Sequence, residues 1–229
     1  MTTSGTASFN LPLTDLVEEA FERASGGERE LRSGYDFKTA RRSLNLLMME
    51  WASRGLNMWT VEQGSIILTP GQDTYDLPED TVDLIEHIMR TGINGSETDL
   101  SLSRISVSTY ATIPNKFHQG RPVQIYIDRQ IQPRFTVWPV PDNSQTYTVV
   151  YWRLRRIQDA GSGVNTQDVP FRFVPCLVAG LAYHIAQKIP EGAPRLPALK
   201  QEYEEAWLIA STEDREKATL RLVPRIYRP

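Results

Sequence analysis

Cysteine is almost absent from this chain of 229 residues, because Cys176 is the only one. A single cysteine cannot form an intramolecular disulfide, which excludes a disulfide-stapled secreted scaffold. The chain also lacks any run approaching the roughly 18 apolar residues that a membrane-spanning helix needs. Residues 1–10 are small and polar, without the basic and apolar stretches of a signal peptide. We therefore expect a protein with no membrane segment that is made in a reducing compartment.

Signatures of common catalytic sites are missing as well. The sequence has no Walker loop, no G-x-S-x-G nucleophile elbow and no H-E-x-x-H zinc motif. The histidines, His87, His118 and His184, are far apart and lack the paired spacing of metal ligands. We therefore predict that the chain has no catalytic residue, no metal and no cofactor. Cys176 and His184 lie in an apolar segment, and we interpret both as packed residues.

An excess of charge of either sign is also lacking. The 25 lysines and arginines against 28 aspartates and glutamates give a formal net charge of -3. This charge provides no overall attraction to nucleic acid or to acidic membranes, so any attraction must come from local patches. The hydrophobic fraction of 40% and the charged fraction of 23% are those of an ordinary globular protein. The length suits one sizeable domain or two small ones.

Residues 34–59 have the strongest helical pattern in the chain. Asp36 is the predicted N-cap, and Gly55 is expected to end the helix. Leu46 and Met49 widen the apolar side, so we expect this helix to have more than one neighbour, from the same chain or from another copy. We predict that it is the centre of a helical core. The apolar residues at steps of three and four that share one face are Phe37, Ala40, Leu44, Leu47, Met48 and Trp51.

Helical and strand patterns divide the rest of the chain. Residues 14–24 are predicted to form a first helix that pairs with the second as an antiparallel hairpin. Alternating or β-branched runs predict strands between the helical regions, with the loop at 139–144 joining the last two as a hairpin. The predicted later helices are residues 173–188 and 198–212. The predicted strands are residues 58–62, 65–69, 74–77, 82–90, 100–105, 123–128, 134–138 and 146–155.

The predicted fold class is therefore α+β. Residues 1–55 and 159–214 are expected to form one helical core built from both chain ends. Residues 56–158 are a β-rich insertion, and residues 215–229 are an extended, basic, proline-containing tail. A pair of independent domains is the alternative, although neither helix pair alone would bury much surface.

Residues 35–80 carry a resemblance to a known family. The helix contains A-R-R-S-L-N-L-L-M-M-E-W-A-S-R-G-L-N-M-W at residues 40–59. Residues 68–80 then read L-T-P-G-Q-D-T-Y-D-L-P-E-D. Together they resemble the head-to-tail adaptors of short-tailed bacteriophages, also called tail accessory factors. The match is looser afterwards, at residues 120–122 and in the basic tail, and it includes no catalytic signature.

This resemblance implies a structural virion protein rather than an enzyme. It implies a homo-oligomeric ring, expected to be a dodecamer, beneath the portal protein at the head-to-tail junction. Such a ring would extend the channel for double-stranded DNA without sequence specificity and would offer a platform to a tail tube or nozzle protein. Synthesis in the host cytoplasm and no contact with a membrane are expected.

Two other functions remain open at this point. The scattered arginines suit a nucleic-acid-binding module, although the net acidity argues against tight groove binding. A peptidoglycan hydrolase carried in the virion would need paired carboxylates, with Glu50 or Asp73 as one partner. The acidic run Glu202, Glu204 and Glu205 is more readily interpreted as a solvated helix face.

Two groups of residues are candidate partner-binding sites. Arginine is enriched at protein interfaces, and the possible subunit interface is Arg41, Arg42, Arg153, Arg155 and Arg156. In the tail, apolar residues are interleaved with arginines, a pattern that suits an extended strand added to the sheet edge of a partner. The resemblance implies that adaptor C-termini reach up into the portal ring. The predicted portal-docking residues are Leu220, Arg221, Leu222, Val223, Arg225, Ile226, Tyr227 and Arg228.

Overall fold

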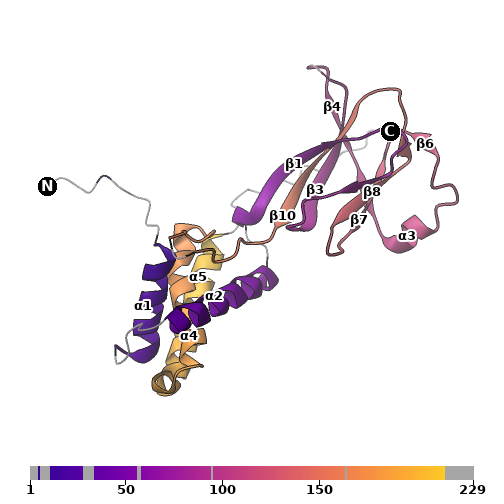
Figure 1. Cartoon of the computed structure of the whole chain (residues 1–229). Coiled ribbons are helices and arrows are strands. Elements are labelled where there is room, and N and C mark those ends of the chain that lie inside the picture. Colours follow the sequence, from indigo (N-terminus) through magenta and orange to yellow (C-terminus); the bar gives the residue numbers. More distant parts are fainter. Residues whose placement is uncertain are drawn as a thin grey trace, which may run out of the picture. The chain divides into compact units, whose positions relative to one another are not determined.

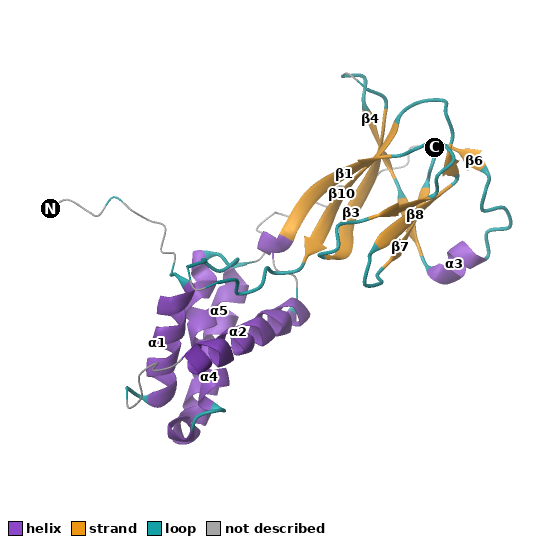
Figure 2. Cartoon of the chain, viewed as in Figure 1, coloured by secondary structure: helices purple, strands orange, loops and turns teal. Residues whose placement is uncertain are grey.

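A computed structural model describes residues 5, 11–27, 34–55, 58–93, 95–162 and 164–214. The chain divides into two compact units, which are described separately (Figure 1). The helical unit comprises Met1–Met58 and Gln158–Pro229, and the β unit comprises Trp59–Ile157. Helices come from both chain ends and strands from the middle, so the predicted α+β class is confirmed (Figure 2). The predicted tail at residues 215–229 lies outside the described residues.

The helical unit contains four main helices, α1 (Leu13–Ser25), α2 (Gly34–Arg54), α4 (Val174–Ala186) and α5 (Leu196–Glu213). The unit also has the short 3-10 helices η2 (Phe171–Phe173) and η3 (Pro190–Arg195), and η1 (Met58–Thr60) spans the point in the sequence where the β unit begins. Residues 190–197, which lie between the predicted helices 173–188 and 198–212, therefore have helical structure of their own. Proline suits the first turn of a helix, where its missing N–H group costs no hydrogen bond.

The centre of the helical unit is α4, which packs against α1, α2 and α5. Almost all of α4 is buried, from Cys176 to Ala186, with only Tyr183 and His184 partly exposed in that span. The predictions that α2 is the centre and that α1 pairs chiefly with α2 are therefore wrong. A helix that is apolar on all sides is buried between neighbours, and α4 has this character more than α2. Gly180 also lets α2 and α5 pack closely against α4. A Cβ added at Gly180 would lie 2.9 Å from Leu47 of α2 and from Tyr203 of α5.

The first sheet of the β unit has the order β1–β10–β3–β4 and is antiparallel throughout. Its strands are β1 (Val61–Ile67), β10 (Tyr147–Arg155), β3 (Thr81–Thr91) and β4 (Thr98–Ser101). Strand β1 runs unbroken through Gly64, so the prediction of two strands separated there is wrong. Gly64 faces the ring of Tyr151 so closely that an added Cβ would lie 2.6 Å from it. This glycine therefore marks a close contact within a strand instead of a turn.

The second sheet has the order β2–β8–β7–β5, with β5 and β7 parallel and the other pairs antiparallel. Its strands are β2 (Thr74–Asp76), β8 (Arg134–Trp138), β7 (Gln124–Asp128) and β5 (Ser103–Ile105). The short strands β6 (Gln119–Gly120) and β9 (Val140–Pro141) pair in parallel, and α3 (Val107–Ala111) is a short helix. Residues of both sheets, including Tyr151 and Phe135, form one buried cluster.

This arrangement corrects the predicted hairpin between residues 134–138 and 146–155. Strand β8 pairs with β2 and β7, whereas β10 pairs with β1 and β3 in the other sheet. Both strands contribute apolar residues to the same core, so their sequence patterns are alike and do not reveal their partners. The chain between them, which includes β9, passes from one sheet to the other.

Candidate interface surfaces

The outward face of α2 carries large apolar side chains exposed to solvent. Tyr35, Leu46 and Met49 are 71%, 60% and 65% exposed, respectively. With Arg42 they are spaced by seven, four and three residues, so the four side chains share one side of the helix. We refer to Tyr35, Arg42, Leu46 and Met49 as the α2 stripe. Uncovered apolar surface of this kind is typical of sites where another protein binds.

A groove with a volume of about 520 Å³ adjoins the α2 stripe. Tyr35, Arg42 and Leu46 of the stripe line it, together with residues of α1 and residues at and after the end of α4. The buried apolar side chains in its lining are Phe21, Ala40, Ile185 and Ile189. The groove therefore offers apolar surface beside exposed apolar side chains, as a helix-binding site does.

Basic groups on this side of the helical unit make hydrogen bonds but no ion pair with a described residue. Arg42 Nη2 donates to Thr39 Oγ1 at 3.2 Å, and Arg41 Nη1 donates to the carbonyl oxygen of Gly161 at 3.2 Å. Lys188 Nζ, which lines the groove, donates to Ser43 Oγ at 2.6 Å. Burial lowers the pKa of Lys188, and the charge of Arg42 lowers it further. The groove lining therefore has two cations, Arg42 and Lys188, beside one buried acid, Asp36, a balance that favours an acidic partner.

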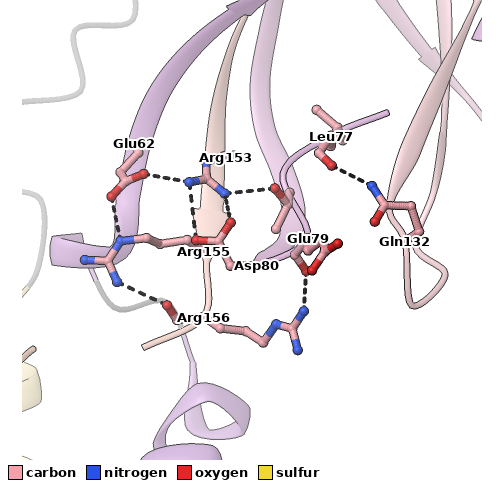
Figure 3. A network of polar contacts seen from close by, with 9 residues as sticks. Glu62, Leu77, Glu79, Asp80, Gln132, Arg153, Arg155 and Arg156 are labelled. Carbon is pink, nitrogen blue, oxygen red and sulfur yellow. Dashed lines mark hydrogen bonds and ion pairs between the residues drawn. The ribbon is translucent and has the colours of Figure 1, made fainter. Parts of the chain in front are cut away.

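The remaining predicted arginines lie in an ion-pair network of the β unit (Figure 3). Arg153 bridges two acids, since its Nη1 lies 2.5 Å from Asp80 Oδ1 and its Nη2 lies 2.8 Å from Glu62 Oε2. Arg155 Nε reaches the other oxygen of Glu62 at 2.6 Å. Arg156 donates to the carbonyl oxygen of Glu79. The network thus joins β1, β10 and the segment leading into β3.

Strand geometry explains this network. Alternate residues of a strand share a face, so Arg153 and Arg155 follow Tyr151 on the side of β10 that builds the core. The register also places Arg153 opposite Glu62 on β1. The two arginine side chains are only 12% and 11% exposed, so their charges are used within the unit. A contact of Arg153, Arg155 or Arg156 with a neighbouring copy stays a prediction.

The same network changes the acidity of one carboxyl group. The hydrogen bond from Arg153 lowers the pKa of Asp80 below its ordinary value, because it favours the ionised form. Asp80 therefore stays charged at neutral pH and holds Arg153 as an ion-pair partner. This role in the fold leaves little of the acid available for proton transfer.

Three of the carboxylates considered in the sequence, Glu50, Glu202 and Glu204, have basic partners. Arg54 Nη2 lies 2.6 Å from Glu50 Oε1 and 2.9 Å from Glu204 Oε1. Its hydrogen bond lowers the pKa of Glu204, so this group is a poor proton donor. Glu202 is paired with Arg23 at 2.8 Å. These contacts favour the interpretation of the acidic run as a helix face.

Cys176 and His184 are packed in the helical unit. Burial raises the pKa of the Cys176 thiol to about 12, so it stays protonated and is a weak nucleophile. His184 is partly buried, with Nε2 at 3.5 Å from Glu50 Oε2, and burial lowers its pKa. Across the residues that the structure describes, no three His, Cys, Asp or Glu side chains are grouped to hold a metal ion. No helix in that part of the chain is long and apolar enough to cross a membrane.

Sequence reasoning found part of the candidate surface. It identified Arg41, Arg42, Leu46 and Met49, which the structure places on the exposed side of α2. It missed Lys188 and the groove, because the groove is lined by segments far apart in the chain. It also missed the exposed pair Leu208 and Ile209 on α5, although an apolar pair on a polar helix face was visible in the sequence. The tail residues 220–228 lie outside the described residues.

An uncovered apolar face on one unit and structural ion pairs in the other indicate a protein that works through contacts with other chains. Comparison with known families agrees. Residues 3–225 match the family of the SU10 adaptor protein, and the chain belongs to this family. It is therefore a structural adaptor of the head-to-tail type, which confirms the class that the resemblance implied.

Among solved structures, a chain of the "Neck of empty GTA particle computed with C6 symmetry" is similar, with a TM-score of 0.28. The alignment covers 100% of both chains at 14% identity. A TM-score of this size carries no argument about the fold. No curated protein matches the chain.

Proposed function

We propose that the chain forms a homo-oligomeric ring, expected to be a dodecamer, at the head-to-tail junction of a virion. The ring binds beneath the portal protein, continues the DNA channel and gives the tail tube or nozzle protein a platform. The observation that carries this proposal is the family match over residues 3–225. The exposed α2 stripe supports it, because a ring needs apolar surface that is still uncovered in the single chain.

The tail provides the proposed contact with the portal. Its residues Leu220, Leu222, Val223, Ile226 and Tyr227 offer apolar anchors, and Arg221, Arg225 and Arg228 offer charge-assisted hydrogen bonds. The apolar anchors would give the docking affinity, and the arginines would give it specificity for acidic groups on the portal surface.

DNA passage requires a channel wall that does not hold the nucleic acid. The formal net charge of -3 suits this requirement, because strong phosphate binding needs a concentration of cations. Arg153 and Arg155 are already neutralised by Glu62 and Asp80. Double-stranded DNA would therefore slide through the ring without sequence-specific contacts.

Electron microscopy of the purified protein mixed with portal rings of the same virus tests the proposal. We expect added ring density on one face of the portal, with the portal's symmetry axis running through it. Portal rings alone and the adaptor alone are the controls. Mixtures in which the adaptor neither adds density nor sediments with the portal would contradict the proposal.

A nucleic-acid-binding function is the second candidate, favoured by Lys38, Arg41 and Arg42, which are exposed on α2. These cations would contact phosphates, so binding to duplex DNA would weaken steeply with salt. Titration of a labelled duplex at several salt concentrations separates the two functions. Tight binding by the single chain that is lost in Arg41→Ala/Arg42→Ala would support the second candidate.

A further inference from the structure

We propose that the α2 stripe and its groove receive the outward face of α5 from a second copy of this chain, with Arg42 paired to the neighbour's Glu205. This inference rests on the proposed ring and adds which surfaces meet in it. The contact is heterologous, since two different surfaces meet in it, the α2 stripe of one copy and the outward face of α5 of the other. Heterologous contacts generate closed rings when the rotation between copies closes.

The outward face of α5 combines exposed apolar side chains with an exposed acid, which the α2 stripe lacks. Leu208 and Ile209 are 64% and 69% exposed, so they offer apolar side chains without a partner in their own unit. Glu205 lies one turn earlier and is exposed. It accepts a hydrogen bond from Gln201 at 2.8 Å and makes no ion pair with a described residue. The face therefore combines one available acid with two uncovered apolar side chains.

Charge favours α5 over the two other candidate occupants of the groove, which are α2 of a second copy and the tail. Two copies meeting through α2 would bring Lys38, Arg41 and Arg42 against the same cations, and like charges at an interface oppose association. The tail at residues 215–229 has five basic residues and one acid, so it is repelled in the same way. Glu205 on α5 instead brings an exposed carboxylate to Arg42, which makes no ion pair with a described residue.

The spacing of the two faces also matches. Leu46 follows Arg42 by four residues, and Ile209 follows Glu205 by four residues, which is about 6 Å along each helix. With the two helices parallel, the ion pair between Arg42 and Glu205 and the apolar contact between Leu46 and Ile209 therefore form together. The helices have similar lengths, with 21 residues in α2 and 18 in α5. Leu208, beside Ile209, widens the apolar contact over the groove.

Disulfide trapping between single-cysteine surfaces tests the contact without portal protein. Proteins carrying Leu46→Cys and Leu208→Cys are mixed at high concentration and oxidised mildly. Cys176 is buried, so the introduced thiols determine the products. We expect the mixed dimer to form several-fold faster than either homodimer. Phe117→Cys, at a side chain 82% exposed in the β unit, gives the rate of random collision.

Three results would overturn the inference. Preferred Leu46→Cys homodimers would mean that two α2 faces meet, and preferred capture of a Tyr227→Cys tail would mean that the groove holds the tail. Rates no higher than that of Phe117→Cys would mean that neither face is a contact. Portal binding can succeed or fail independently of these rates, so the proposed function is judged separately.

A charge exchange tests the ion pair itself. Arg42→Glu in the Leu46→Cys protein, or Glu205→Arg in the Leu208→Cys protein, should each reduce the mixed dimer several-fold. Combining both changes should restore the amount of mixed dimer, because opposite charges then face each other again with their positions exchanged. Both residues are exposed, and unchanged thermal unfolding of each variant checks the fold. Equal losses in the single and combined variants would show that Arg42 and Glu205 do not pair.

Discussion

Trp51 and Tyr203 are joined by a buried hydrogen bond, in which Trp51 Nε1 donates to Tyr203 Oη at 2.9 Å. The two residues are 152 positions apart, on α2 and α5, and at most 1% of either residue is exposed. Tyr203 Oη also donates to Glu50 Oε1 at 3.2 Å. Phe173 and Trp207 pack on the Trp51 ring with centroid distances of 5.6 Å and 5.1 Å. Helices α2 and α5, from the two ends of the chain, therefore share one aromatic core.

Removal of this hydroxyl should weaken the helical unit. Tyr203→Phe removes the hydroxyl that accepts the buried indole N–H of Trp51, and loss of such a buried hydrogen bond costs about 1–3 kcal/mol of unfolding free energy. Urea unfolding followed by tryptophan fluorescence measures the loss. Tyr110→Phe is the matched control, because the Tyr110 hydroxyl makes no hydrogen bond with a described residue. Equal stabilities of the two variants would show that the Trp51 hydrogen bond contributes nothing.

Leu47 and Leu46 give a matched pair on one helix. Leu47 is fully buried against Gly180 of α4, whereas Leu46 is 60% exposed on the α2 stripe. Leu47→Ala should therefore lower the unfolding free energy of the single chain by about 2–5 kcal/mol. Leu46→Ala should change it by less than about 0.5 kcal/mol, as surface substitutions usually do. Similar losses in the two variants would mean that the assigned face of α2 is incorrect.

Local patterns were enough to find the four main helices of the helical unit. The predicted helices at 14–24, 173–188 and 198–212 correspond to α1, α4 and α5 within a few residues at each end. Helical periodicity depends on neighbours three and four positions away, so the sequence contains it directly. Strand pairing is different. Strands β8 and β10 offer similar apolar faces, so their sequences do not reveal which strands lie beside them. Only the packing of the complete core decides this.

The residues of the candidate surface also divide into those that local sequence reveals and those that depend on packing. Leu46 and Met49 stood out in the sequence because they extend the apolar side of a helix. Lys188 did not, because its place in the groove depends on how α1, α2 and α4 pack. The network of Arg153 depends on the pairing of β1 with β10 in register. The sequence offered these arginines as a possible subunit interface, whereas Arg153 and Arg155 are largely buried in ion pairs within the β unit.

Gly64 gives a test of the close contact in β1. An added Cβ would lie 2.6 Å from the Tyr151 ring, a distance that requires the ring or the strand to move. Gly64→Ala should therefore destabilise the β unit by about 1–3 kcal/mol, the usual cost of overpacking. Gly120→Ala is the control, because its nearest atom would be 3.6 Å away. Thermal unfolding compares them, and a Gly64→Ala protein as stable as Gly120→Ala would contradict the contact.

Acid should weaken the β unit through Asp80. Arg153 lowers the pKa of Asp80 in the folded chain, so its stabilisation is complete above the ordinary pKa of 3.8. The stabilisation is lost as the pH falls through the lowered value, because the folded state must then take up the proton. Asp80→Asn should reduce the unfolding free energy at pH 7 and flatten its fall below pH 4. The effect is modest, since the Asp80 side chain is 47% exposed.

Glu79→Gln is the matched control for Asp80→Asn. It removes a neighbouring negative charge, but only the backbone carbonyl of Glu79 takes part in the network. Urea unfolding between pH 3 and pH 7 should therefore leave Glu79→Gln with the acid dependence of the unsubstituted chain. If Asp80→Asn keeps the full acid dependence of the unsubstituted chain, Asp80 is not the group that causes this dependence.

Deletion of residues 220–229 tests the proposed docking tail. The contacts described here hold α1, α2, α4 and α5 together without these residues, so the thermal unfolding midpoint should not change. Binding to portal rings should be lost, because the apolar anchors and the arginines Arg221, Arg225 and Arg228 are removed together. Cosedimentation and electron microscopy with portal rings measure binding.

A tail of unchanged length with serine at Leu220, Leu222 and Val223 separates the loss of anchors from the loss of length, and should also fail to bind. Normal ring assembly on the portal by the truncated chain would end the docking hypothesis, even if α2 and α5 still joined neighbouring copies.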